Sequence, residues 1–277
     1  MTYPAPAPEI CQSHLAVAPW MDPLGARLPG LQPVAPGQWI QRDDAFNGQM
    51  AYRDRLISER FDDVVIAQPY VSQAERDLLL AIIAAIAENP GYKRTGETIV
   101  RPDGVRVNLT ATRPLVAAAR LVQEDLLLLE PGTPGHTLVA GVVCFPASWT
   151  FRQKMGRGLM GIHVPVERYD AGMGQRIERI LNALQPGKAV WRANVLCYND
   201  PNLYQPRLES ERRPFDPGKP LWVRVERQTL MRLAPSHVIV FTIHTHIVPF
   251  HALTQEQAET LPLAVRQGGS MGEPLQR

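Results

Sequence analysis

The side chains best suited to chemistry are concentrated in the second half of this 277-residue chain. His163 stands alone between Ile162 and Val164, ahead of Pro165. A lone histidine in an apolar segment can be a hydrogen-bonded core residue. It can equally be a metal ligand, because neutral imidazole is the commonest metal ligand in proteins and haem iron is often held by a histidine in an apolar pocket. The sequence leaves both interpretations open.

A second histidine pattern lies nearer the C-terminus, where His244 and His246 are two residues apart. On a strand both side chains point to the same face. The pair could therefore supply two ligands to a non-haem metal, with Glu226 or His163 as a further ligand. The neighbouring residues alternate to the other face: Phe241, Ile243, Thr245 and Ile247. This alternation instead predicts that the two histidines lie on a solvated face.

The segment 221–230 reads LWVRVERQTL and is predicted to be a strand. Arg224 and Glu226 would share one face, either as an exposed rim or as the lining of a polar pocket. In a pocket the two would fix one another's charge, and the carboxylate could bind a protonated amine or relay protons. Arg227 points to the opposite face in this register, where we expect a structural ion pair. Arg192 shares a strand face with Asn194.

Two further motifs carry weaker indications. Cys144 could be a thiolate haem ligand or a small buried hydrophobe. The run Gly156–Gly161 matches the dinucleotide fingerprint GxGxxG, a motif that needs a strand before it and a helix after it. The residues that follow, Pro165 among them, predict an extended segment over 158–164. We therefore interpret the glycines as points where the backbone turns or passes close to another group.

The expected elements place helices mainly in the first half and strands in the second. Helices are predicted over 46–60, 72–88, 114–130 and 174–184, and strands over 99–101, 105–109, 137–145, 189–198, 221–233 and 238–248. Ser72 with Glu75, and Thr254 with Gln257, have the spacing of capping boxes. This order predicts an α+β fold with a mainly antiparallel sheet that encloses an apolar pocket.

Composition limits the classes of partner. The chain is 45% apolar and 20% charged, with a net charge of +2, so charge indicates neither a nucleic-acid nor a membrane partner. No apolar run approaches the ~18 residues of a membrane span. Three distant cysteines and the lack of a signal-peptide pattern predict a reducing compartment, the cytoplasm. We expect an extended proline-rich arm over 1–36, one domain over 37–265 and a flexible tail over 266–277.

Five motifs, in the same order, resemble those of the haem-dependent oxidative N-demethylases: Cys144–Trp149, Lys154–Gly156, Ile162–Val166, Arg192–Asn194 and Val225–Leu230. The stretches Leu28–Leu31 and Trp39–Asp44 resemble the N-terminal portion of the same family. Each motif alone is weak, and the ordered combination is what makes the resemblance specific.

The resemblance implies a fold related to PAS sensor domains, with a curved antiparallel sheet and helices enclosing haem b. It implies oxidation of a secondary amine such as dimethylamine by O₂, with electrons from NADPH, to a primary amine and formaldehyde. His163 matches the histidine expected to be the proximal iron ligand, and Glu226 is the candidate partner of an ammonium substrate. Arg224 and Arg227 are candidates for a haem propionate or for orienting that carboxylate. Arg192 is a further candidate for cofactor binding.

The redox partner is expected to be a separate chain, because this one shows no flavin module and no cysteine cluster for an iron–sulfur centre. Two other functions stay open. One is a PAS-like sensor that binds haem or a small ligand without turnover, because fold does not decide function. The other is a non-haem metal oxygenase that uses His244 and His246.

Overall fold

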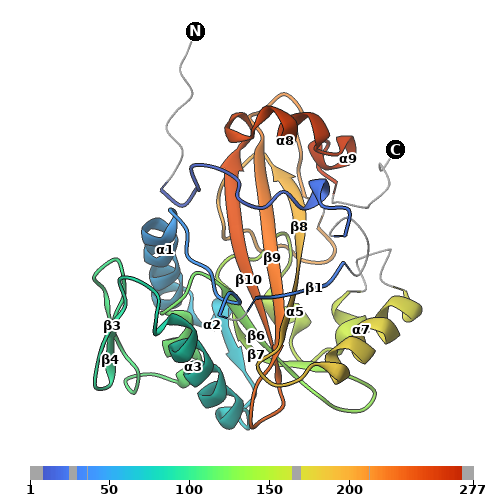
Figure 1. The fold of residues 1–277 in the computed structure, drawn as a ribbon. Coiled ribbons are helices and arrows are strands. Elements are labelled where there is room, and N and C mark those ends of the chain that lie inside the picture. Colours follow the sequence, from blue (N-terminus) through green and yellow to red (C-terminus); the bar gives the residue numbers. More distant parts are fainter. Residues whose placement is uncertain (1–8, 25–29, 36, 164–169, 212, 270–277) are drawn as a thin grey trace.

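The centre of the fold is a seven-stranded antiparallel sheet (Figure 1). This computed structural model describes residues 9–24, 30–35, 37–163, 170–211 and 213–269. In their order across the sheet, the strands are β1 (Gln32–Pro33), β8 (Ala189–Tyr198), β9 (Trp222–Arg232), β10 (Ile239–Pro249), β6 (Asp125–Glu130), β7 (Thr137–Val142) and β2 (Val65–Ala67). A smaller sheet consists of β3 (Lys93–Thr95), β4 (Thr98–Val100) and β5 (Arg106–Asn108).

Short helices and a few longer ones surround the large sheet. They are η1 (Pro19–Met21), α1 (Phe46–Glu59), α2 (Phe61–Val64), α3 (Ser72–Ile86), α4 (Pro114–Ala119), α5 (Phe151–Lys154), α6 (Leu159–Ile162), α7 (Ala171–Ala183), η2 (Phe250–Ala252), α8 (Gln255–Thr260) and α9 (Leu263–Arg266). The predicted α+β class with a mainly antiparallel sheet is confirmed. Among the helices described, none combines the length and the apolar character that crossing a bilayer requires.

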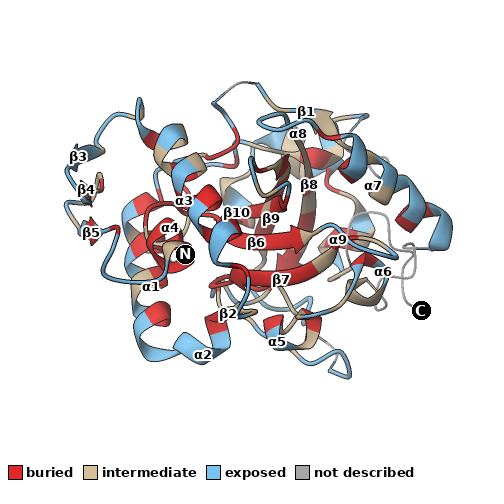
Figure 2. Cartoon of the chain, turned by 90° about the horizontal axis from the view of Figure 1, so that it is seen from below, coloured by how far each residue is buried: buried red, intermediate tan, exposed pale blue. Residues whose placement is uncertain are grey.

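The central strands are buried on both faces, as the burial colours of Figure 2 show. The face that packs against α5, α6 and α7 is called the α7 face; its contacts include Leu127, Leu129, Ile243, Phe151, Leu159 and Leu181. The opposite face, called the α3 face, packs against α3 and α4 through residues that include Leu128, Val240, Leu78, Ile82 and Leu115. Further along β8 and β9, the α3 face is covered by the N-terminal segment, α8 and α9, through Leu15, Leu261 and Val265.

The predicted hairpin of β9 and β10 decides which side chains share a face. Thr245 lies opposite Glu226, and His244 lies opposite Arg227. Residues opposite one another in a ladder project to the same side of the sheet. Glu226 and Thr245 therefore belong to the α7 face, and Arg227 and His244 to the α3 face.

One stretch of β10 has no neighbouring strand on one side, because β6 pairs with it only as far as Ile243. Two glutamine side chains take that place. Gln12 Nε2 and Gln49 Nε2 donate to the Thr245 carbonyl at 3.2 and 3.1 Å. Ile247 N donates to Gln12 Oε1 at 2.6 Å, and Gln12 N donates to the Ile247 carbonyl at 3.1 Å. The N-terminal segment is thus fixed to the sheet by paired amide contacts.

The helix predicted over 114–130 is wrong in its second half. Helix α4 ends at Ala119, and residues 125–130 form β6. The run Leu126–Leu129 is buried between β7 and β10. A short unbroken apolar run fits a strand buried on both faces as well as it fits a buried helix, so periodicity did not separate the two.

Two predictions of local structure at helix starts are also wrong. Ser72 does not cap α3, whose N-cap residue is Val71 without a side-chain hydrogen bond; Glu75 instead pairs with Arg113. The segment expected to be extended over 158–164 contains the helical turn α6, and its last residue lies outside the described residues. The capping box formed by Thr254 at the start of α8 is confirmed.

Candidate functional site

Arg224 and Glu226 form a buried ion pair on the α7 face of β9. Arg224 Nη2 donates to Glu226 Oε1 at 3.2 Å. The same guanidinium donates to the backbone carbonyls of Leu203, at 3.1 Å, and Phe145. Because both side chains are buried, the exposed rim considered for this strand is wrong. A guanidinium held at three points also has a fixed direction, since turning away would leave buried carbonyl oxygens without donors.

Glu226 is more basic than an ordinary glutamate. Burial raises its pKa, and the neighbouring Arg224 guanidinium offsets only part of that rise. A carboxyl group in this environment takes up a proton more readily than one in water. Glu226 therefore has the electrostatics of a group that can bind an amine or hold its proton.

Arg192 brings a second cation to the same face from β8. In the register of β8 and β9 it lies opposite Gln228, and Asn194 lies opposite Glu226. Burial lowers the pKa of Arg192, and the charge of Glu226 counteracts that effect. Its Nε atom is buried and has no hydrogen-bond partner among the described residues. A buried donor with unused capacity is uncommon in proteins and indicates a place for a further acceptor.

His163 follows directly after α6, whose Leu159 and Ile162 pack in the apolar cluster of the α7 face. Its Nδ1 lies 2.8 Å from the carbonyl oxygen of Leu159. Because a carbonyl only accepts hydrogen bonds, Nδ1 carries the proton in this contact and the lone pair is on Nε2. Burial lowers the pKa of His163, and the charges of Lys154 and Arg192 lower it further. A neutral imidazole with its lone pair on Nε2 is the form that binds a metal.

These side chains form one electrostatically connected group on the α7 face. The charge of Arg192 acts on His163 and on Glu226, and Glu226 contacts Arg224. Four of the five site residues that the family resemblance implied are linked in this way: His163, Arg192, Arg224 and Glu226. The fifth, Arg227, lies on the α3 face.

Arg227 has structural partners of its own. Its guanidinium donates to Thr229 Oγ1 at 3.0 Å and to the Gln38 carbonyl at 3.1 Å, and it lies over the Trp191 ring at 5.1 Å. It points away from Glu226, as the strand register predicted. The ion pair expected for it is wrong, because within the described part of the chain its direct contacts are these neutral groups.

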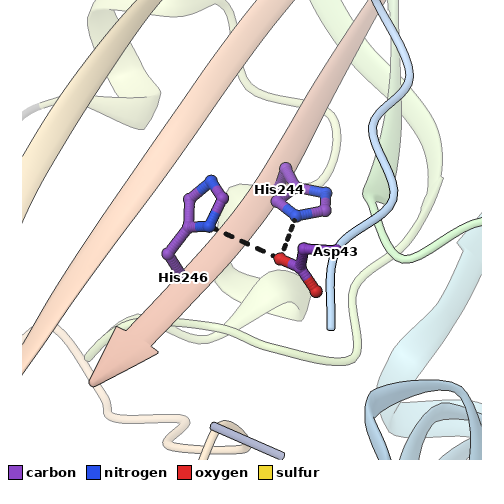
Figure 3. Close-up of side chains that lie close together, drawn as sticks. All are labelled: Asp43, His244 and His246. Carbon is purple, nitrogen blue, oxygen red and sulfur yellow. Dashed lines mark hydrogen bonds and ion pairs between the residues drawn. The ribbon is translucent and has the colours of Figure 1, made fainter. Parts of the chain in front are cut away.

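A second polar group lies on the α3 face, where His244 and His246 meet Asp43 (Figure 3). His244 Nε2 is 2.9 Å and His246 Nδ1 is 3.4 Å from the same oxygen, Asp43 Oδ2. Both histidines are buried, so the prediction of a solvated face is wrong: this sheet has no solvated side at that point. The acidic residue beside them is Asp43, while Glu226 and His163, considered earlier as the further ligand, lie on the α7 side.

Sequence reasoning missed Asp43 as a partner of these histidines. It is 201 residues away from His244 in the chain. The stretch Trp39–Asp44 stood out only by family resemblance, without a role. No local spacing could have paired an aspartate before α1 with a strand near the C-terminus.

Carboxylates on two sides of His244 stabilise its positive charge. Its Nδ1 lies 3.1 Å from Glu124 Oε1, opposite the contact with Asp43. Burial opposes the charged form, but hydrogen bonds to Asp43 and Glu124 outweigh it and raise the pKa of His244 to about 9. His246 behaves differently, since burial lowers its pKa despite the contact with Asp43. One histidine of the pair is therefore a cation and the other is neutral.

Cys144 lies in the hydrophobic core and is fully buried. Burial raises the pKa of its thiol to about 12, although Arg53 acts in the opposite direction. A thiol with such a pKa stays protonated near neutral pH, and only the thiolate is a good metal ligand. This environment supports the interpretation of Cys144 as a small buried hydrophobe.

Fold and site together define an α+β protein in which a neutral histidine and a buried arginine–glutamate pair share one face of an antiparallel sheet. The chain belongs to a known family: residues 30–271 match the family described as haem-dependent oxidative N-demethylase, alpha subunit-like. The resemblance inferred from the ordered motifs is confirmed. The description of the family names haem dependence, oxidative N-demethylation and an alpha subunit.

Proposed function

We propose that this protein is a haem-dependent oxidative N-demethylase acting on a secondary amine of the dimethylamine kind. The observation that carries the proposal is His163. Its Nδ1–H is held by the Leu159 carbonyl and its lone pair is on Nε2, in a chain that belongs to a haem-dependent family. Histidines that ligate metals commonly donate their other ring N–H to a carbonyl or carboxylate, which fixes the ring and makes it a better ligand.

The residues of the α7 face have the chemistry that haem b requires. His163 offers an axial nitrogen, and Leu159 and Ile162 extend an apolar cluster beside it. Arg192 offers a partly buried cation whose buried Nε has an unused donor, which suits a propionate. We therefore propose a PAS-like haem pocket on this face. When bound, haem would supply the activation of O₂ and the oxidation of an N-methyl carbon.

Glu226 is proposed to hold the substrate amine. A secondary amine is largely an ammonium ion near neutral pH, and a buried carboxylate binds it by a charge-assisted hydrogen bond. The raised pKa of Glu226 suits it to accept the ammonium proton at a carboxylate oxygen, which leaves a neutral amine for oxidation. Arg224 acts as a positioning residue, because its contact with Glu226 Oε1 fixes that carboxylate against β9.

The overall reaction balances with an external two-electron donor. Dimethylamine, O₂, NADPH and one proton give methylamine, formaldehyde, water and NADP⁺. The three cysteines of this chain are free thiols, two of them buried in the core, and do not form a group suited to an iron–sulfur centre. We therefore propose that a separate flavin or iron–sulfur reductase delivers the electrons, which agrees with the words "alpha subunit" in the description of the family.

The test begins with the visible spectrum of the protein reconstituted with haem, ferric and dithionite-reduced. We expect a Soret band that is lost or shifted in His163→Ala and unchanged in His251→Ala, an exposed histidine outside the site. A Soret band unchanged in position and intensity in His163→Ala would refute the ligand assignment.

Turnover is tested separately, with a reductase, NADPH and a series of secondary amines. Formaldehyde should appear in step with NADPH consumption, and Glu226→Gln should raise KM for the amine while leaving the Soret band in place. If the fully haem-loaded protein produced formaldehyde from none of the amines, the proposed enzymatic activity would be refuted. That result would favour the PAS-like sensor considered from the sequence.

A further inference from the structure

We propose that Asp43, His244 and His246 form a binding site for one divalent transition-metal ion, separate from the proposed haem site. The candidate ligand atoms all lie within 4.8 Å of one another. In a tetrahedral site, ligand atoms about 2.1 Å from the metal are about 3.4 Å apart. The contacts of Asp43 Oδ2 with His244 Nε2, at 2.9 Å, and with His246 Nδ1, at 3.4 Å, are already close to that spacing (Figure 3).

The state of His246 is independent evidence for a missing partner. Its side chain is buried, Nε2 has no hydrogen-bond partner within the described part of the chain, and Nδ1 has only the 3.4 Å contact with Asp43 Oδ2. A buried polar group without a hydrogen bond costs free energy, so native structures rarely contain one unless it serves a ligand. In Figure 3 the ring lies beside His244 with one nitrogen directed at Asp43. The two rings are 4.7 Å apart between centroids.

The surrounding groups hold the other two candidate ligands in position. Glu124 Oε1 lies 3.1 Å from His244 Nδ1, and a carboxylate on the outer nitrogen of a histidine is a common arrangement around bound zinc. Asp43 Oδ1 accepts hydrogen bonds from Gln123 Nε2 at 2.8 Å and from Ala45 N at 3.0 Å. Oδ2 faces the histidines and also accepts a hydrogen bond from Gln12 Nε2 at 2.8 Å. Such outer contacts orient ligands without taking their place.

The donor set and charge suit a metal such as Zn²⁺ or Fe²⁺. Two imidazoles and one carboxylate are typical ligands of both ions, and the hard cations Mg²⁺ and Ca²⁺ prefer oxygen alone. Asp43 and Glu124 bring two negative charges, and Arg227, across from His244, brings one positive charge. A dication can replace the proton on His244 Nε2, which passes to solvent on binding.

Access to the site is from the side of Asp43. Its side chain is 18% exposed, whereas the side chains of His244 and His246 are 0% and 4% exposed. Three protein ligands would leave at least one coordination position for water or a small ligand. The site therefore resembles an accessible three-ligand site more closely than a closed four-ligand structural site.

The test measures metal in the haem-loaded protein. Total iron and zinc are determined by mass spectrometry, and haem is counted separately so that non-haem iron is distinguished. After chelation, Zn²⁺ and, under anaerobic conditions, Fe²⁺ are titrated by calorimetry. We expect one equivalent of metal per chain and a preference that identifies which ion is native.

Single substitutions test which residues bind the metal. Asp43→Asn and His246→Gln preserve shape and should weaken binding at least tenfold, Glu124→Gln should weaken it about 10–100-fold, and His251→Ala should bind as the wild type does. The Soret band and far-UV circular dichroism check that each variant is folded. Absence of one-equivalent binding of either metal to the wild-type chain would overturn the proposal. So would wild-type affinity in the folded Asp43 or His246 variant, because the metal would then bind elsewhere.

Discussion

Replacing Arg224 with glutamine tests the buried pair at the proposed site. Arg224 is fully buried and donates to Glu226 and to the carbonyls of Leu203 and Phe145. Glutamine cannot reach all three acceptors, so at least one buried carbonyl loses its donor and Glu226 loses its counter-charge. Removing one partner of a buried ion pair costs about 3–5 kcal/mol. We expect Arg224→Gln to lose that much, a large part of the ~5–15 kcal/mol typical of a protein's free energy of unfolding.

The second half of this prediction concerns coupling. Glu226→Gln keeps an acceptor for Arg224 but leaves its buried positive charge without a counter-charge, so we expect it to cost about 3–5 kcal/mol as well. The double variant, with both residues changed to glutamine, leaves no buried charge at the pair. Its loss should be about 1–3 kcal/mol smaller than the sum of the two single losses.

Urea denaturation followed by circular dichroism and tryptophan fluorescence measures all four free energies of unfolding. If the free energy of unfolding falls with urea concentration at the same slope in all four proteins, their unfolded states are comparable. The reasoning is refuted if Arg224→Gln lies within about 1 kcal/mol of the wild type, or if the losses simply add. Either result would mean that the pair is solvated and does not fix Glu226.

Three further predictions concern pH, core packing and a helix cap. Glu226 has a pKa raised above its ordinary 4.5, so the folded state binds more protons than the unfolded state between those two values. The wild type should therefore lose stability relative to Glu226→Gln as pH rises through that window, measured as the difference in urea midpoints; a constant difference would contradict the shift. Leu128→Ala, in central β6, should cost about 2–5 kcal/mol by thermal or urea unfolding, and Leu80→Ala, 64% exposed on α3, should change stability by less than about 0.5 kcal/mol. Thr254→Ala should cost about 1 kcal/mol and speed amide exchange in α8; protected amides in the variant would show that the capping box is dispensable.

Much of the second half of the fold was predictable from the sequence. Strand β8 has the predicted bounds, and β9 and β10 form the predicted hairpin to within a residue or so at each end. These segments alternate in polarity and are joined by a short turn, which are local signals. The run Leu126–Leu129 was not assignable in the same way, because one of the two strands that enclose it, β10, is distant in sequence.

The candidate sites were likewise predictable from the sequence only where local signals position their residues. Strand alternation correctly placed Arg224 with Glu226 and turned Arg227 away from them. It also put His244 and His246 on one face, but it could not show that this face is covered, since the covering segment comes from the N-terminal part of the chain. Long-range contacts of that kind leave no periodic signal in either segment.

The contacts of Gln12 and Gln49 with β10 have a consequence for self-association. An unpaired strand edge offers a template on which another chain can add a strand and begin to aggregate. Here the Thr245 carbonyl and both the amide and the carbonyl of Ile247 are already bonded, partly by side-chain amides that imitate a neighbouring peptide. A side chain that occupies such an edge cannot itself be extended into a further strand. Strand β10 is thereby closed to intermolecular pairing at the point where β6 ends.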